Sequence, residues 1–169
     1  MTTAETRWLG TAEQAAWRGY INGSQRLSAR LEQDLKVHGT THDDYRILVL
    51  LSEAPDDRLR MAELAELSVE SRSRLSHHVA RLERRGLVAR QSCPSDGRGQ
   101  FAVLLPAGRH LIEAVAPHHV EGVRAWFLDH LEPDEMAVIG TAFARIDAAL
   151  CARADHGAGP DDGPDPEPA

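Results

Sequence analysis

The chain has 169 residues, of which 42% are hydrophobic, a formal net charge of −7 at pH 7, and two cysteines. Its length fits one globular domain with helical extensions, and its apolar content argues against disorder of the whole chain. No apolar run approaches the roughly 20 residues of a transmembrane helix. The N-terminus lacks the pattern of a secretory signal, and two cysteines are too few for a disulfide scaffold. We therefore expect a cytoplasmic protein without a membrane partner.

The acidic total conceals a basic segment. From Ser71 to Gln100 the chain holds seven arginines against two acidic residues, a local charge of +5. From Ala154 to Ala169 it holds five acidic residues and no basic one, a local charge of −5. A phosphate group responds mainly to charges within a Debye length of about 8–10 Å. The acidic total therefore does not exclude nucleic-acid binding by the basic segment.

Apolar residues at helical spacing dominate the first half of the chain. Gly19 and Gly23 weaken the expectation of an unbroken first helix, and Gly39 is expected to end it. The expected elements are a flexible lead-in over residues 1–11, a helix over about 12–37, a second helix from His42 that closes at Pro55, and a short strand at Leu59-Arg60 that pairs with a later hairpin.

The segment Met61–Leu105 predicts a helix, a turn, a second helix and a β-hairpin. Leu75, Val79 and Leu82 recur at helical spacing and form one apolar stripe, with Ser71 as the N-cap of this second helix. Such a combination is typical of a winged helix-turn-helix. The expected boundaries are a helix from Met61, a second helix from Ser71 to Gly86, strands at Leu87–Arg90 and Phe101–Leu105, and a turn over Pro94–Gly99.

Two more helices are expected after the hairpin, one opening at Pro106 and one near Glu132. Pro117 should kink or divide the first of them. The predicted fold class is therefore mainly α with a small β-hairpin wing, a winged helix-turn-helix whose N- and C-terminal helices form a dimerisation region. The expected domains are the winged helix-turn-helix over about 43–105, dimerisation helices over about 12–37 and 107–152 (together residues 12–152), and a disordered acidic tail over 153–169.

The terminal helices are more apolar than a small winged module needs for its own core. They fit either a homodimer interface or one larger monomeric core, and periodicity alone does not separate the two. Helix-turn-helix proteins commonly read two half-sites with twofold symmetry, which favours the dimer.

The outward face of the helix from Ser71 carries donors and cations at a spacing that suits a DNA groove. A solvated arginine-rich face is the alternative, but the hairpin tip weakens it. Arg98 stands among glycines, where an arginine can enter a narrow minor groove, and Asp96 is placed to hold the loop in shape. The residues expected to contact DNA are Ser71, Arg72, Ser73, Arg74, Ser76, His77, Arg81, Arg84, Asp96 and Arg98.

The stretch LAELSVESRSRLSHHVARLERRGLVAR, followed by SCPSDGRGQFAVLLPAG, resembles the MarR-type winged helix-turn-helix regulators. The resemblance covers roughly Trp17 to Ala149. It implies a homodimeric, sequence-specific regulator of transcription, a repressor that a small and often aromatic effector releases from a pseudo-palindromic operator. The helix from Ser71 would then lie in the major groove and Arg98 in the minor groove. Candidate effector-binding residues are Trp17, Tyr20, His42, Tyr45 and Arg46, for which core packing is the alternative.

Two departures from the family pattern stand out. Ser68 and Glu70 precede the recognition helix where apolar residues are common, and Glu70 beside DNA would weaken phosphate binding or alter specificity. The sequence Leu-Pro-Ala-Gly at 105–108 replaces the usual Leu-Thr-x-x-Gly. Glu70 and the acidic tail suggest an alternative function, a winged-helix module that binds proteins and does not itself bind DNA.

Catalytic and metal-binding motifs are weak in this chain. Cys93 is either a thiol activated by Arg90 and Arg98 or a plain hairpin cysteine. The nine histidines do not converge at metal-ligand spacing, so neither a metal site nor a cofactor is expected. No nucleophile elbow, phosphate loop or pair of catalytic carboxylates is evident, so we do not expect an enzyme.

Overall fold

A computed structural model describes the backbone of residues 6–93 and 96–157, and the side chains of residues 6–93 and 99–152. The chain divides into two compact units, Met1–Trp126 and Phe127–Ala169, which we describe one at a time. Within the described residues, no helix has the length and apolar character needed to cross a membrane. The flexible lead-in falls partly outside the described residues, and the acidic tail from residue 158 onward falls wholly outside them.

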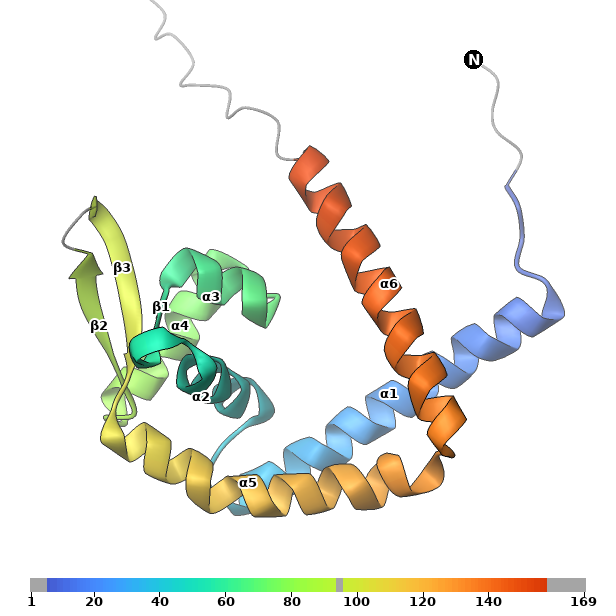
Figure 1. Cartoon of the computed structure of the whole chain (residues 1–169), viewed down its shortest axis with the longest axis horizontal. Coiled ribbons are helices and arrows are strands. Elements are labelled where there is room, and N and C mark those ends of the chain that lie inside the picture. Colours follow the sequence, from blue (N-terminus) through green and yellow to red (C-terminus); the bar gives the residue numbers. More distant parts are fainter. Residues whose placement is uncertain (1–5, 94–95, 158–169) are drawn as a thin grey trace, which may run out of the picture. The chain divides into compact units, whose positions relative to one another are not determined.

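The described residues of the first unit form five helices and a small sheet (Figure 1). This architecture confirms the predicted mainly helical class with a small sheet. Its elements are α1 (Thr11–Val37), α2 (His42–Glu53), the 3-10 turn η1 (Pro55–Asp57), β1 (Arg58–Arg60), α3 (Met61–Ser68), α4 (Arg72–Arg84), β2 (Val88–Cys93), β3 (Asp96–Leu104) and α5 (Pro106–Trp126).

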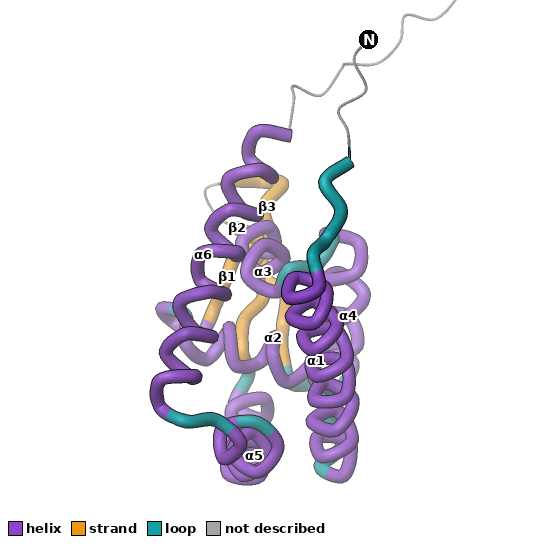
Figure 2. Tube along the Cα trace, turned by 90° about the vertical axis from the view of Figure 1, so that its right-hand side faces the viewer, coloured by secondary structure: helices purple, strands orange, loops and turns teal. Residues whose placement is uncertain are grey.

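The sheet is antiparallel, in the order β1-β3-β2 (Figure 2). Ala102 on the central strand β3 faces Leu59 of β1 on one side and Arg90 of β2 on the other. The short strand expected at Leu59-Arg60 is therefore confirmed, as is its pairing with the hairpin.

The hairpin is longer than the sequence predicted. Strand β3 already begins at Asp96, which pairs with Cys93, so the turn expected over Pro94–Gly99 is wrong. The register shifts between Ser92 and Cys93, and such an irregularity lets the strands continue pairing past a mismatch. Glycine accepts extended as well as turn conformations, so a glycine-rich segment does not mark a turn by itself.

One apolar core joins the helix-turn-helix to the sheet. Leu75, Val79 and Leu82 of α4 have no exposed surface, which confirms the predicted stripe. Each such side chain stabilises the fold by about 1.5–3 kcal/mol relative to an exposed one. Their buried neighbours are Ile47, Leu48 and Leu51 of α2, Leu64 of α3, and Val88 and Ala102 of the sheet.

Of the kink or division expected at Pro117, the division does not occur, because α5 runs as one element through this proline. Both sides of Pro117 pack against α1. Val115 belongs to a buried cluster with Leu35 of α1, and Gly122 lies close to Leu31. This packing offsets the one backbone hydrogen bond that proline removes. Helix α1 is likewise unbroken at its two internal glycines.

The described residues of the second unit form the 3-10 turn η2 (Leu128–His130) and the helix α6 (Pro133–Gly157). The Glu135 side chain accepts a hydrogen bond from the backbone N–H of Glu132 at 2.9 Å, which caps the start of α6. The helix continues to Gly157, so the predicted boundary at residue 152 is too early. Helix α6 leaves Val138, Ile146 and Leu150 more than half exposed.

Gly108 marks a close approach between α5 and the wing. A Cβ atom at this position would overlap the Leu87 carbonyl oxygen and lie 2.7 Å from Leu104 Cδ1.

We expect Gly108→Ala to lower the free energy of unfolding by about 1–3 kcal/mol, because the backbone carbonyl cannot move aside. Gly19→Ala is the matched control, since a Cβ there meets nothing within 4 Å. It should raise stability by about 0.5–1 kcal/mol. Equal effects in urea titrations would contradict this packing.

Candidate nucleic-acid interface

Helix α4 presents a polar face opposite its buried stripe. Ser71 is its N-cap, and the Ser71 hydroxyl accepts a hydrogen bond from the Arg74 backbone N–H at 3.3 Å, as predicted. The side chains that α4 and its cap expose are Arg72, Ser73, Arg74, Ser76, His77 and Arg84, together with Ser71 itself. All of these were predicted as DNA contacts from the sequence.

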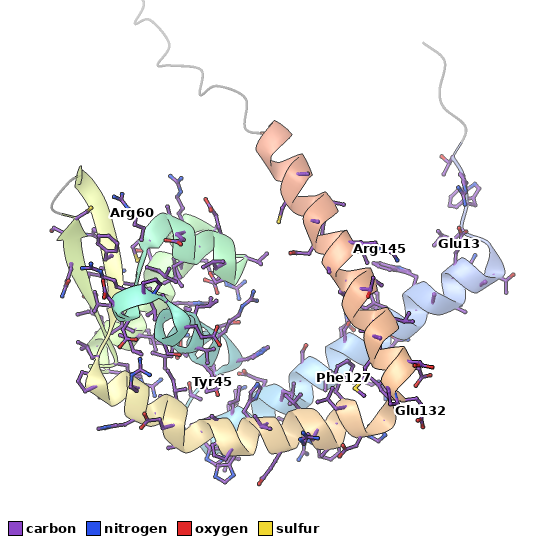
Figure 3. All side chains as sticks on the ribbon, in the orientation of Figure 1. Glu13, Tyr45, Arg60, Phe127, Glu132 and Arg145 are labelled. Carbon is purple, nitrogen blue, oxygen red and sulfur yellow. The ribbon has the colours of Figure 1, made fainter. Side chains whose placement is uncertain are left out.

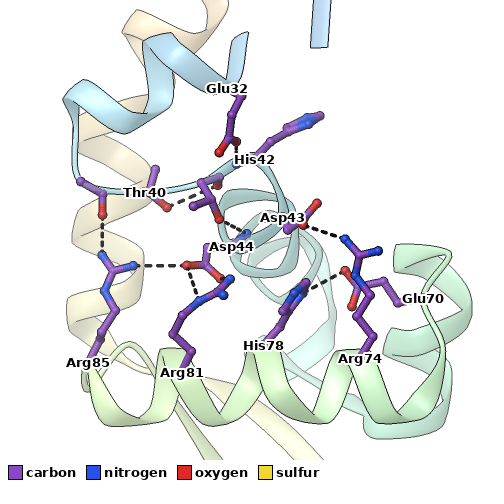
Figure 4. A network of polar contacts seen from close by, with 12 residues as sticks. Glu32, Thr40, His42, Asp43, Asp44, Glu70, Arg74, His78, Arg81 and Arg85 are labelled. Carbon is purple, nitrogen blue, oxygen red and sulfur yellow. Dashed lines mark hydrogen bonds and ion pairs between the residues drawn. The ribbon is translucent and has the colours of Figure 1, made fainter. Parts of the chain in front are cut away.

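A buried carboxylate on α2 holds two arginines of α4 (Figure 4). The Asp44 side chain is only 2% exposed. Arg81 donates to it from Nε at 3.2 Å and from Nη2 at 2.5 Å, and Arg85 donates from Nη1 at 3.4 Å. The hydrogen bonds that Arg81 donates to Asp44 raise the pKa of Arg81 above its ordinary value. Arg81, expected from its position on the helix to contact DNA, is thus already bound within the protein.

Arg74 makes a weaker contact with the neighbouring acid. Its Nη2 lies 3.2 Å from Asp43 Oδ2, and the two side chains are 62% and 47% exposed. An exposed pair of this kind contributes about 0–1 kcal/mol, so a phosphate or base can displace it. Arg74 therefore stays available to a ligand at the surface. Among the described side chains, Arg72 and Arg84 have no acidic partner.

The wing is tied to α4 by Arg90 of β2. Its Nη2 donates to the Ser76 carbonyl oxygen at 2.7 Å and to the Ser76 hydroxyl at 3.2 Å, and its backbone N–H donates to Glu83 at 3.0 Å. These bonds fix the base of the hairpin against the helix. Asp96 and Arg98 lie in the backbone of β3, but their side chains are outside the described residues.

Glu70 does not face outward, contrary to the concern raised by the sequence. Its side chain is 9% exposed, and its Oε1 lies 3.0 Å from Nδ1 of His78, which is 11% exposed. His78, which the sequence analysis did not single out, faces inward, whereas the preceding His77 is exposed. This orientation removes one of the two arguments for a protein-binding module.

The predicted effector residues separate into groups. Tyr45 packs against His119 with ring centroids 5.0 Å apart, and His42 lies 6.4 Å from the same ring. Burial raises the pKa of Tyr45; burial and the nearby His42 lower the pKa of His119. Figure 3 shows Tyr45 where α2 faces α5. Arg46 instead donates to the Leu67 carbonyl oxygen at 2.9 Å.

Trp17 and Tyr20 form a separate pair on α1, with ring centroids 5.8 Å apart. Tyr45 belongs to a buried cluster with Leu35, near the opposite end of the same helix. At a rise of 1.5 Å per residue, Trp17 and Leu35 are roughly 27 Å apart along α1. Within one subunit, therefore, the five predicted residues do not line a common pocket.

An open pocket of about 340 Å³ between α1 and α5 was not predicted. His38 and His118 stack at its edge with centroids 4.4 Å apart, and Trp126 donates from Nε1 to Asp34 at 3.1 Å. The helical spacing of these residues places them on one face of α1 and one face of α5. The sequence did not show that these two faces meet.

Comparisons with known proteins agree with this architecture. A family model described as MarR family matches residues 38–99. The crystal structure of AbsC, a MarR family transcriptional regulator from Streptomyces coelicolor, is 45% identical and superposes with a TM-score of 0.84, covering 87% of this chain and 99% of AbsC. This chain belongs to the MarR family. It is therefore a winged-helix member of a family of transcriptional regulators.

Two further relatives support the family assignment. Sco3205, a MarR family regulator from the same organism, was solved in complex with DNA. It is 43% identical, with a TM-score of 0.84 and coverage of 88% of this chain and 93% of Sco3205. The transcriptional regulator HosA of Escherichia coli O111:H- is 29% identical over 111 residues, covering 66% of this chain and 78% of HosA.

The contrast between the two aspartates of α2 gives a test of stability. We expect Asp44→Asn to lower the free energy of unfolding by about 1–3 kcal/mol, because two arginines lose their charged acceptor. Asp43→Asn should change it by less than about 1 kcal/mol, because its pair is exposed. Urea denaturation followed by circular dichroism measures both, and equal losses would contradict a structural role for Asp44.

Proposed function

We propose that this MarR-family regulator is a homodimer that binds a pseudo-palindromic operator and represses transcription until a small effector releases it. The observation that carries the DNA-binding part is the outward face of α4. Its donors and cations lie opposite a fully buried stripe, so the helix can enter a major groove without unfolding any of the core.

Within this proposal the exposed residues of α4 have different tasks. Ser73, Arg74 and His77 lie on the outward turns of the helix and read base edges, while Arg72 and Arg84 neutralise phosphates. Ser71 and Ser76 donate to the phosphate backbone. At the wing tip, Arg98 enters the adjacent minor groove and Asp96 supports the loop. Arg81 contributes by holding α4 in place rather than by reading DNA.

Exposed apolar side chains support a dimer. Helix α1 leaves Trp17 and Tyr20 about half exposed, and α6 leaves Ile146 and Leu150 exposed by 51% and 61%. Large apolar surfaces on the terminal helices are typical of a surface that a second subunit covers. We therefore assign residues 12–37 and 107–152 to dimerisation, and we assign residues 43–105, which contain α4 and the wing, to DNA binding.

An effector site fits the region where His42, Tyr45 and His119 meet. Two rings there lie beside His119, whose pKa is lowered by burial and by the nearby His42, a suitable environment for an aromatic ligand with a polar substituent. Trp17 and Tyr20 contribute only if a second subunit brings its own copy of α1 close. Release from DNA then requires the ligand to bind better to the DNA-free form.

Footprinting of the purified protein on the DNA that flanks its own gene tests the function as a whole. We expect a protected site with twofold symmetry that overlaps the promoter, and lower transcription in vitro when the protein is added. A footprint without symmetry would contradict the dimer, and higher transcription would contradict repression. No salt-sensitive DNA binding at all would favour the protein-binding module instead.

The recognition surface has its own prediction. Arg74→Ala and Arg98→Ala should each weaken binding to the footprinted DNA by about 5- to 100-fold, because a specific contact contributes about 1–3 kcal/mol. Fluorescence anisotropy measures the affinity. Arg7→Ala, an exposed arginine ahead of α1, is the matched control and should bind as tightly as the unchanged protein. Unchanged binding in both Arg74→Ala and Arg98→Ala would show that another surface contacts DNA.

A further inference from the structure

Three potential metal ligands meet behind the recognition helix. Asp43 comes from the first turn of α2, Glu70 from the turn between α3 and α4, and His78 from the middle of α4 (Figure 4). One carboxylate oxygen of each acid and one ring nitrogen of the histidine all lie within 4.8 Å of one another. Three separate elements of the DNA-binding module therefore place donor atoms at a single point.

The buried members of this cluster have unused donor atoms. Glu70 Oε2 and His78 Nδ1 are buried without a hydrogen-bond partner among the described residues. Nδ1 lies 3.0 Å from Glu70 Oε1, but the two atoms are not aligned as a hydrogen bond. The Glu70 side chain is more than nine-tenths buried, and a buried polar atom left unpaired costs about 1–3 kcal/mol, more when charged. A cation held between the three groups would remove that cost.

We propose that Asp43, Glu70 and His78 bind a divalent transition-metal ion of the Zn²⁺ type. A neutral imidazole with two carboxylates suits Zn²⁺ and its neighbours, whereas Ca²⁺ and Mg²⁺ prefer oxygen ligands alone. Three protein ligands leave a further coordination position for water. Asp43 is 47% exposed, so the ion reaches the buried pair from its side. The site lies outside the residues that we assign to the effector.

The position of the site connects it to the recognition helix. Asp43 also pairs with Arg74 at 3.2 Å, and His78 is four residues after Arg74 on α4. An ion that takes the Asp43 carboxylate frees Arg74 from this pair, and it joins α2 to α4 directly. If α4 reads DNA as proposed above, metal binding therefore strengthens DNA binding by up to about fivefold, the value of an exposed ion pair. By linkage, DNA strengthens metal binding by the same factor.

Titration of the full chain with Zn²⁺ alone tests the site, with calorimetry for the affinity and Co²⁺ absorption for the coordination. We expect saturable binding at this site and d–d absorption typical of coordinated Co²⁺. Glu70→Gln and His78→Gln should each weaken binding at least tenfold. Glu70→Gln nearly preserves the shape of the side chain, so it keeps the test valid if His78→Gln fails to fold by circular dichroism.

The double variant His118→Gln/Glu121→Gln is the matched control, because it removes an exposed histidine and glutamate 3.8 Å apart on α5. It should bind Zn²⁺ at the proposed site as tightly as the unchanged chain. No Zn²⁺ binding, or binding that only this control weakens, would overturn the proposal. DNA affinity with Zn²⁺ and with a chelator is measured separately. If DNA is not bound in either condition, the proposed function fails while the titration still decides the metal site.

Discussion

The buried carboxylate of Asp44 fixes the position of the recognition helix. Asp44 lies in the first turn of α2. The backbone N–H of Asp44 donates to the side chain of Thr41, the N-cap of this helix, at 3.2 Å. Arg81 and Arg85 reach it from α4, and Arg85 also donates to the Gly39 carbonyl oxygen at 2.8 Å. A buried charge is costly unless its partners are correctly placed, so the pair penalises any other position of α4. Burial of the apolar stripe stabilises the packing of α4, and the contacts with Asp44 fix where α4 lies along α2.

This constraint divides the basic charge of the segment by task. Arg81, Arg85 and Arg90 hold α4 against α2 and β2, whereas Arg72, Arg74 and Arg84 remain at the surface. The local charge of +5 that suggests DNA binding therefore overstates the charge available to phosphates. It also explains how an acidic chain keeps a basic face, since the buried Asp44 neutralises Arg81 and Arg85, while Arg74 makes only an exposed pair with Asp43.

Sequence periodicity was sufficient for the elements and the core. Leu75, Val79 and Leu82 predicted the buried face of α4, Ser71 predicted its start, and Leu59 predicted a strand beside the hairpin. Local sequence signals gave wrong predictions where contacts between distant residues determine the backbone conformation. Pro117 does not divide α5 because α1 supports both sides of it. The glycines of the wing fall within β3 because β2 pairs with the strand on either side of them, at Asp96 and at Gln100.

The candidate DNA-binding site also combines features that the sequence predicted with features that only the fold reveals. Position on a helical wheel identified the exposed residues of α4, but it could not separate Arg74, which stays at the surface, from Arg81, which meets Asp44 some 37 residues earlier in the chain. Glu70 was expected to face outward, and it instead lies beside His78. The histidines alone suggested no metal site, because the cluster needs two carboxylates from other elements and only folding brings these together.

The salt dependence of operator binding tests the central claim, that α4 uses its outward arginines for DNA and its inward arginines for structure. The slope of log K against log salt is negative, and its magnitude falls by about 0.9 for each phosphate contact that is lost. The account predicts a fall of nearly two in Arg72→Ala/Arg84→Ala and little change in the slope of Arg81→Gln/Arg85→Gln under conditions where both variants are folded. An equal fall in both double variants would contradict it.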